Sequence, residues 1–293
     1  MGESGGERVV LVTGAGKGLG AAFATILAAN GARVIVNNRT RPGEPSSAEA
    51  IASDIRRSGG LAIAETSDVT APGAARALCS AALDSFGRLD ALILNAGVNG
   101  PAARVATGDP AAFRDVLEIN FHANVTLVQA ALPHLIAAPS GRILFVSSTA
   151  GLYGVRGRAA YAASKGALNA FALSLAAELR RDRVGVNILM PYAATQMTKS
   201  LLTPERMAAM APEAAAPAAR WLVSPFCTET GGIWVAGGGR FRRAAPVEFG
   251  IPAVSLDVAQ AAGLADPRTF ADAEAAFADF LASAPSAEQA AAE

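Results

Sequence analysis

The sequence predicts an α/β fold in which a parallel sheet carries helices on both faces. Short apolar runs rich in Val, Ile and Leu alternate with longer stretches of helical periodicity over most of the 293 residues. Apolar residues make up 52% of the chain and charged residues 17%, so the chain can bury a large core. This alternation is typical of βαβ crossovers, which set parallel strands side by side.

The strand candidates are apolar runs bounded by turn-forming residues. In chain order they are Val9–Val12, Arg33–Asn37, Leu61–Ala64, Leu89–Leu94, Arg142–Val146, Val184–Leu189 and Ile233–Ala236. The helix candidates between them place apolar residues at helical spacing. They are Ala21–Asn30, Ser46–Ser58, a helix within Ala71–Phe86, Pro110–Ile136 and Tyr161–Arg180. We expect the helix at 110–136 to bend or end near Pro133, because proline lacks the backbone N–H.

The alternation stops after about Phe249, which divides the chain into a domain at 1–250 and an extension at 251–293. Within the extension, Thr269–Ala282 carries apolar residues at helical spacing and is expected to form a helix. The tail Pro285–Glu293 is rich in Ala and Glu and is expected to fray.

Composition excludes several classes of function. The formal net charge is zero, so no nucleic-acid partner is expected. Cys79 and Cys227 have no neighbouring Cys or His at metal spacing, so neither a metal site nor a disulfide scaffold is expected. No run of eighteen apolar residues occurs, and residues 1–7 lack the features of a secretion signal. These features predict a cytoplasmic protein without a membrane partner.

A glycine-rich turn, Thr13-Gly14-Ala15-Gly16-Lys17-Gly18-Leu19-Gly20, joins the first strand to the first helix. Glycines let the turn close and let backbone N–H groups approach a phosphate at the helix start. A tight turn without a ligand is the alternative. Two further polar segments, Asn95-Ala96-Gly97 and Ser147-Ser148, also directly follow strands, so all three are expected at one edge of the sheet.

Tyr161 and Lys165 stand four residues apart in a predicted helix, with Ser148 thirteen residues before the tyrosine. Side chains at this spacing share one helix face. A phenol ordinarily has a pKa of about 10, and a nearby ammonium lowers it. Such a phenol can exchange the proton that accompanies hydride transfer. A surface pair without a role is the alternative.

The ordered set of the glycine turn, Asn95-Ala96-Gly97, Ser148 and the Tyr161–Lys165 pair resembles the short-chain dehydrogenase/reductase family over roughly residues 8 to 240. The resemblance implies a Rossmann-like, doubly wound sheet of about seven strands that forms homodimers or homotetramers. It implies a dinucleotide-binding catalytic domain at 1–250. It also implies reversible hydride transfer between a nicotinamide and a carbonyl or secondary alcohol.

In that family the tyrosine is the acid–base group, which would be Tyr161 here. Lys165 would lower its pKa and hold the nicotinamide ribose, and Ser148 would bind the substrate oxygen. Asn120 matches the helix asparagine that positions a proton-relay water. Ser147 is expected to be a structural neighbour, since the spacing favours Ser148.

The same resemblance implies a set of cofactor-binding residues. Asp68 and Val69 match the pair that lines the adenine, and Pro191 and Thr195 match the segment that meets the carboxamide. Leu94 departs from the family's usual Asn-Asn-Ala-Gly, and Tyr192 replaces the glycine that usually follows the proline. The expected cofactor-binding residues are Thr13, Gly14, Gly16, Lys17, Gly18, Leu19, Gly20, Asn38, Arg39, Asp68, Val69, Asn95, Ala96, Gly97, Tyr161, Lys165, Pro191 and Thr195.

The segment after the second strand indicates which nicotinamide is favoured. A carboxylate there would bind both ribose hydroxyls and repel a 2′-phosphate, but the chain reads Asn37-Asn38-Arg39. Arg39 can bind a phosphate bidentately, and Lys17 adds charge in the glycine turn. Both favour NADP(H) over NAD(H), unless these side chains are only solvated surface charges.

Within the family, the glycine turn and the stretch Ala216–Leu222 are similar to the hydroxyacyl-CoA dehydrogenase module of multifunctional β-oxidation enzymes. That likeness implies a 3-hydroxyacyl or 3-oxoacyl thioester substrate, and the chain is expected to be a ketone or 3-oxoacyl reductase. Arg156 and Arg158 could meet an anionic substrate group or face water. A non-enzymatic NADP(H)-binding sensor on the same fold is the alternative function.

Overall fold

The computed structural model describes residues 8–41, 43–193, 203, 207, 210–250, 265–271 and 273–283. The chain divides into two compact units, Met1–Arg243 and Ala244–Glu293. The expected boundary at residue 250 stays a prediction.

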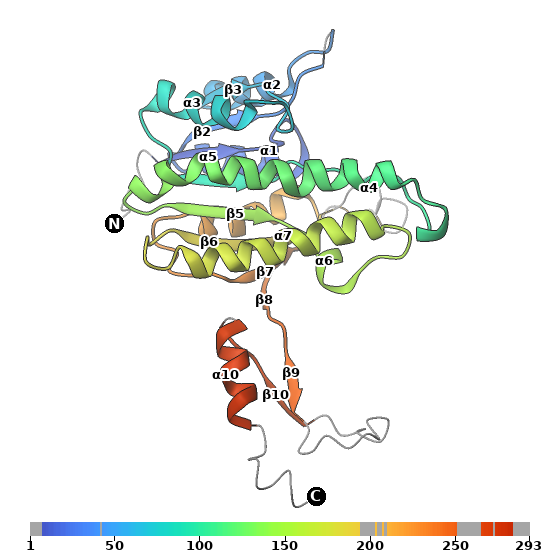
Figure 1. The fold of residues 1–293 in the computed structure, drawn as a ribbon. Helices are drawn as coiled ribbons and strands as arrows, with labels where there is room; N and C mark the ends of the chain where they lie inside the picture. Colours follow the sequence, from blue (N-terminus) through green and yellow to red (C-terminus); the bar gives the residue numbers. More distant parts are fainter. Residues whose placement is uncertain are drawn as a thin grey trace, which may run out of the picture. The chain divides into compact units, whose positions relative to one another are not determined.

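The first unit contains an eight-stranded sheet in the order β3-β2-β1-β4-β5-β6-β7-β8 (Figure 1). The strands are β1 Val9–Val12, β2 Arg33–Asn37, β3 Leu61–Glu65, β4 Ala91–Leu94, β5 Arg142–Val146, β6 Gly185–Pro191, β7 Ile233–Gly237 and β8 Arg240–Ala244. Strands β1 to β7 pair in parallel. The predicted parallel, Rossmann-like sheet is therefore confirmed, and β8 is an additional strand that follows a two-residue turn, Gly238 and Gly239.

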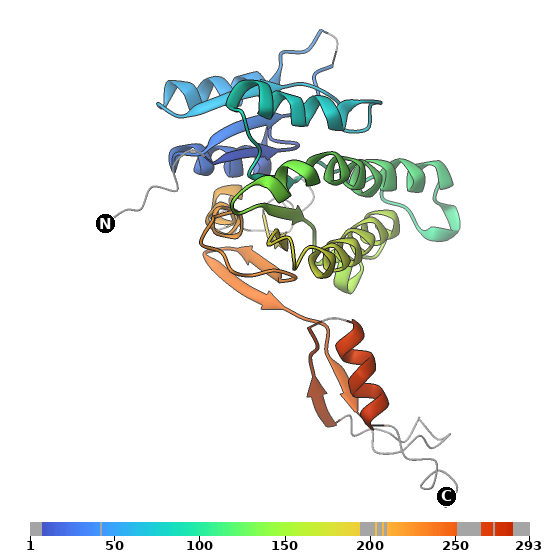
Figure 2. The same cartoon turned by 60° about the vertical axis from the view of Figure 1, so that its left-hand side comes forward.

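Helices cover the sheet on both faces, with α3, α5 and α7 on one face and α1, α2 and α9 on the other (Figures 1 and 2). The longer helices are α1 Gly18–Ala29, α2 Ser47–Arg57, α3 Ala74–Phe86, α4 Pro110–Leu117, α5 Ala123–Ala137 and α7 Ala159–Glu178. The short ones are α6 Ala150–Tyr153, α9 Ala216–Leu222, and the 3₁₀ turns Val105–Thr107 and Pro212–Ala214.

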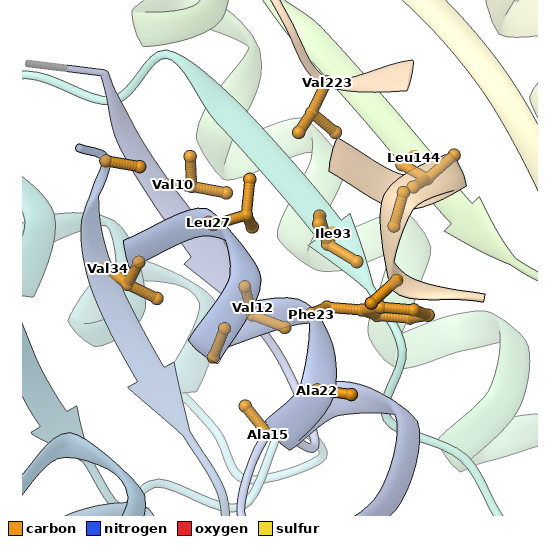
Figure 3. Packing of buried hydrophobic residues seen from close by; sticks show 14 of the residues in the cluster. Val10, Val12, Ala15, Ala22, Phe23, Leu27, Val34, Ile93, Leu144 and Val223 are labelled. Atoms are coloured by element: carbon orange, nitrogen blue, oxygen red, sulfur yellow. The ribbon is translucent and has the colours of Figure 1, made fainter. Parts of the chain in front are cut away.

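The core on the α1 side of the sheet forms because alternate strand residues face that helix. Val10 and Val12 of β1 and Ile93 of β4 pack against Phe23 and Leu27 of α1 (Figure 3). Their strand neighbours point to the opposite face, where they are also buried. Burial on both faces explains why the strands read as continuous apolar runs rather than as alternating patterns.

The predicted helix at 110–136 is divided by a π-helical turn, Glu118–His122, between α4 and α5. Of the two expectations at Pro133, a bend stays a prediction, whereas an end at the proline is wrong, because α5 continues through it to Ala137. A proline removes only one helical N–H donor, and the surrounding core still holds this helix. Its buried side chains include Leu127, Ala131 and Leu135.

The second unit contains a two-stranded antiparallel sheet, β9 Glu248–Gly250 and β10 Ala265–Arg268, and the helix α10 Ala273–Ser283. Arg268 forms an ion pair with Asp279 of α10 at 2.8 Å. The helix expected at 269–282 is present and starts at Ala273. The sequence analysis did not predict β9 or β10, whose lengths of three and four residues give little periodic signal.

Candidate active site

The segments that follow β1 and β4 are joined at the carboxyl edge of the sheet. The Thr13 hydroxyl accepts hydrogen bonds from the backbone N–H groups of Asn95 and Ala96, at 3.0 and 3.1 Å. The Asn95 amide donates in return to the carbonyls of Thr13 and Gly14. The sequence predicted this meeting of the two segments, and the described contacts show that Asn95 fixes the glycine turn directly.

The glycine turn passes too close to its neighbours for larger residues at three positions, of which Gly14 would place a Cβ 2.8 Å from the Ala96 Cα. A Cβ added to Gly20 would lie 2.4 Å from the Gly14 carbonyl oxygen and 2.6 Å from the Asn95 amide. A Cβ on Gly16 would lie 2.3 Å from the Ser47 hydroxyl. At Gly18, whose φ is +58°, an added Cβ would meet open space. The turn is open at Gly18, where α1 begins, and the backbone N–H groups at a helix start can bind a phosphate. This geometry fits the phosphate site that the glycine pattern predicts.

Two polar residues follow β2, where the ribose end of a dinucleotide is expected. The Asn38 amide donates to the Ser47 hydroxyl at 2.7 Å. The guanidinium of Arg39 lies 2.9 Å from a carboxylate oxygen of Asp68, the residue expected to line the adenine. Hydrogen bonds with Thr70 and Arg39 hold the pKa of Asp68 below its ordinary value, although burial opposes them. Arg39 and Asp68 therefore lie side by side, and Lys17 is exposed at the start of α1.

Tyr161 lies in the first turn of α7 and Ser148 just beyond β5. Burial raises the pKa of Tyr161 above its ordinary value, and a hydrogen bond with Ser148 partly offsets this rise. The Ser148 hydroxyl also accepts a hydrogen bond from the Ala150 N–H at 3.1 Å, which fixes its position. The structure thus brings together the Tyr161 phenol and the Ser148 hydroxyl, as the sequence predicts.

Lys165 is almost fully buried, with 5% of its surface exposed. Its ammonium donates to the Val146 carbonyl oxygen at 2.8 Å and lies 5.9 Å from the centre of the Tyr161 ring. Burial lowers the pKa of Lys165 to about 8. In this arrangement burial raises the pKa of Tyr161 above its ordinary value, and the expected lowering of that pKa by Lys165 stays a prediction.

Asn120 lies in the π-helical turn and is fully buried. Its side chain exchanges two hydrogen bonds with the backbone of Val98, at 2.8 and 2.9 Å. Its amide also donates to the Ser164 hydroxyl, which in turn donates to the Tyr161 carbonyl. Such π-helical turns are frequent at functional sites. Sequence reasoning found Asn120 but missed Ser164, whose place directly before Lys165 was the available signal.

The remaining predicted residues are placed as follows. Val69 follows Asp68 beyond β3, Pro191 ends β6, and Thr195 lies outside the described residues. Gly97 lies against Asn120, since an added Cβ would be 3.1 Å from that amide oxygen. Arg158 donates to the Gly100 carbonyl at 2.6 Å and so ties two loops beside the site together.

Two negative findings concern the part of the chain that the structure describes. None of its helices is both long enough and apolar enough to cross a bilayer. Its His, Cys, Asp and Glu side chains form no group of three that could bind a metal ion.

Comparisons with known proteins agree with this geometry. A family model described as short chain dehydrogenase matches residues 8–206. A Mycobacterium tuberculosis protein named as a short-chain type dehydrogenase/reductase is 34% identical over 247 residues, covering 82% of this chain and 85% of that protein. Peroxisomal multifunctional enzyme type 2 of Mus musculus is 36% identical over 239 residues. The match covers 79% of this chain and 32% of the mouse enzyme, so the chain spans about a third of that relative's length.

A solved short chain dehydrogenase of Shigella flexneri, complexed with NADP, is also similar. It superposes with a TM-score of 0.71 at 29% identity, covering 78% of this chain and 96% of that one. The sequence similarity and the shared fold point to the same family as the site residues.

Proposed function

Since the chain belongs to the short-chain dehydrogenase family, whose members act on CH–OH and C=O groups, we propose that it reduces a ketone or 3-oxoacyl group with NADP(H). The observation that carries the proposal is that four residues are linked near the end of β5 and the start of α7. Ser148 interacts with Tyr161, Lys165 bonds the end of β5, and Asn120 reaches the Tyr161 carbonyl through Ser164. A reduced nicotinamide supplies a hydride when bound, and a proton must then reach the carbonyl oxygen.

Tyr161 is the proposed proton donor. Burial keeps its phenol protonated at neutral pH, which suits reduction, because the substrate oxygen needs a proton as it gains negative charge. Ser148 donates a hydrogen bond to the same substrate oxygen and stabilises that charge. The phenolate left on Tyr161 is then reprotonated along a path that we assign to Lys165 and Asn120.

The residues of the cofactor cradle suit NADP(H). The open side of the glycine turn leaves room for a diphosphate, and no carboxylate follows β2 directly. Arg39 and Lys17 are the proposed contacts of the 2′-phosphate, for which Arg39 would leave or share its bond with Asp68. The NADP complex of the Shigella flexneri relative supports this preference by analogy.

The 3-oxoacyl substrate rests on the resemblance to the hydroxyacyl-CoA dehydrogenase module, which the match to the mouse multifunctional enzyme supports. The proposed location is the cytoplasm. A homodimer or homotetramer is also proposed, by resemblance to the family. Light scattering of the purified chain tests the oligomer, with a monomer at working concentration as the contradicting result.

The test of the proposed reaction is loss of NADPH absorbance with acetoacetyl-CoA, a straight-chain ketone and cyclohexanone, each repeated with NADH. We expect turnover with at least one carbonyl and a higher kcat/KM with NADPH. NADPH binding without turnover of any carbonyl would support the sensor instead, and absence of binding to both nucleotides would refute the proposal.

A further inference from the structure

Ser147 and Asn169 form a buried hydrogen bond that the proposed proton transfer does not use directly. The Ser147 hydroxyl donates to the Asn169 amide oxygen at 2.6 Å, and the two residues are 4% and 5% exposed. The bond links the loop after β5 to the middle of α7, 22 positions apart in sequence. Among the residues that the structure describes, the side chains of Ser147 and Asn169 have one further link to the proposed machinery, a contact of 3.4 Å from the Ser147 hydroxyl to the Lys165 carbonyl.

Three consecutive residues at the end of β5 contact three residues on one face of α7. Val146 accepts from Lys165 and Ser147 donates to Asn169, while Ser148 lowers the pKa of the third residue, Tyr161, against the effect of burial. The helix residues are spaced four apart, so their side chains lie along one face. The contacts therefore fix the height and rotation of α7 relative to the strand end.

The helix α6 leaves little room for the Asn169 side chain to move. A Cβ added to Gly151 of α6 would lie 2.8 Å from the Asn169 amide nitrogen and 2.7 Å from the Lys165 carbonyl carbon. The amide nitrogen is buried and has no hydrogen-bond partner among the residues that the structure describes. A buried donor without a partner costs free energy. The Asn169 side chain bears this cost while its amide oxygen accepts from Ser147, which indicates that the bond to Ser147 has a role.

We propose that Ser147 and Asn169 are positioning residues, which hold Ser148 at bonding distance from the Tyr161 phenol. This inference rests on the proposed function, since it concerns the geometry of the same proton transfer. Ser147 is joined to Ser148 by one peptide bond, so loss of its bond to Asn169 loosens the backbone that carries Ser148 and leaves the Ser148 hydroxyl held only by the Ala150 N–H. A displacement on the order of 1 Å at a reacting group can reduce a rate about a hundredfold.

The test compares Ser147→Ala, Asn169→Leu and the double variant with the unaltered chain, using NADPH and the best carbonyl of the panel. We expect each single variant to lose roughly ten-fold in kcat with the KM for NADPH unchanged. The double variant should lose no more than one single variant, because the two residues act through one bond. Ser147→Thr, which keeps the hydroxyl, should restore most of kcat.

The pH dependence of the rate of alcohol oxidation distinguishes positioning of Ser148 from a general stabilisation of the fold. Ser148 lowers the pKa of Tyr161, so freeing Ser148 should move the rising limb of alcohol oxidation to higher pH in Ser147→Ala. Asn187→Leu is the matched control, because Asn187 is also buried and bonded to the backbone, but in β6. This control should lower the melting temperature and leave the limb in place.

Several results would overturn the inference. One is a Ser147→Ala variant with normal kcat and an unshifted rising limb in its pH profile. The others are additive losses of kcat in the double variant, or a shifted rising limb in Asn187→Leu. If Asn169→Leu does not fold, Ser147→Ala and Ser147→Thr decide the question alone. Normal turnover in Tyr161→Phe would refute the proposed function itself, whereas an inactive Tyr161→Phe beside a normal Ser147→Ala would refute only this inference.

Discussion

Burial of the charged Lys165 side chain costs folding free energy. Its ammonium is buried with one hydrogen bond to a carbonyl oxygen, and burial lowers its pKa from 10.5 to about 8. A difference of this size corresponds to on the order of 3 kcal/mol against folding with the lysine charged. A buried amine of this kind is retained where its chemistry is needed, which agrees with its proposed place in proton return.

Lys165→Met should therefore stabilise the fold while abolishing turnover. Below about pH 8 the folded chain must bury the ammonium, so the penalty is fully present there. Between about pH 8 and 10.5 the unfolded chain binds more protons, so the unaltered protein gains stability and the advantage of the variant shrinks. Urea unfolding across this range measures the effect. A variant that is less stable than the unaltered chain at about pH 7 would contradict it.

Arg39 is expected to discriminate between the two nicotinamides. Arg39→Ala should raise the KM for NADPH about ten-fold and leave the KM for NADH nearly unchanged, because a charged hydrogen bond to the 2′-phosphate is lost. Arg41→Ala is the matched control, since Arg41 is an exposed neighbour paired with Glu44. Equal effects of the two variants, or equal effects on both nucleotides, would remove Arg39 from the proposed 2′-phosphate site.

At the scale of the elements, the strands and the crossover helices could be predicted because their periodicity is local. The Tyr161–Lys165 pair could be placed on one face of α7 for the same reason. The π-helical turn at Glu118–His122 could not, because its residues are compatible with an ordinary helix and the extra residue per turn depends on tertiary contacts. The elevated pKa of Tyr161 also depends on burial by distant segments, which a local pattern does not report.

Two helical glycines should respond in opposite directions to alanine. Gly20→Ala should cost about 1–3 kcal/mol and weaken NADPH binding, because its Cβ would meet the Gly14 carbonyl and the Asn95 amide. Gly166→Ala should gain about 0.5–1 kcal/mol, because its Cβ would meet the Gly151 carbonyl at an ordinary 3.5 Å. Thermal unfolding and nucleotide titration measure both. A neutral Gly20→Ala would show that the turn is looser than its contacts indicate.

At the scale of the whole molecule, the first unit holds the eight-stranded sheet, except for the last residue of β8, and every described residue of the proposed site. The second unit offers only two short strands and one described helix, too little to form a large core. The two units are therefore expected to contribute unequally to folding and to nucleotide binding.

A chain that stops after Val247, which keeps β8 whole, should fold and bind NADPH with nearly unchanged affinity. The matched control stops after Gly239 and loses β8. This control should be less stable and more prone to aggregate, because it exposes the edge of β7. Circular dichroism and nucleotide titration compare the two. Failure of the longer chain to fold would assign the second unit a structural role in the first.

The central claim is that the buried phenol of Tyr161 supplies the proton, and Tyr161→Phe tests it most directly. The variant keeps the ring and its packing, so NADPH affinity by fluorescence titration should stay within about two-fold, while kcat falls on the order of 10²–10⁴-fold. Turnover of the best carbonyl at the rate of the unaltered chain, with the variant fully folded and NADPH bound, would contradict the account.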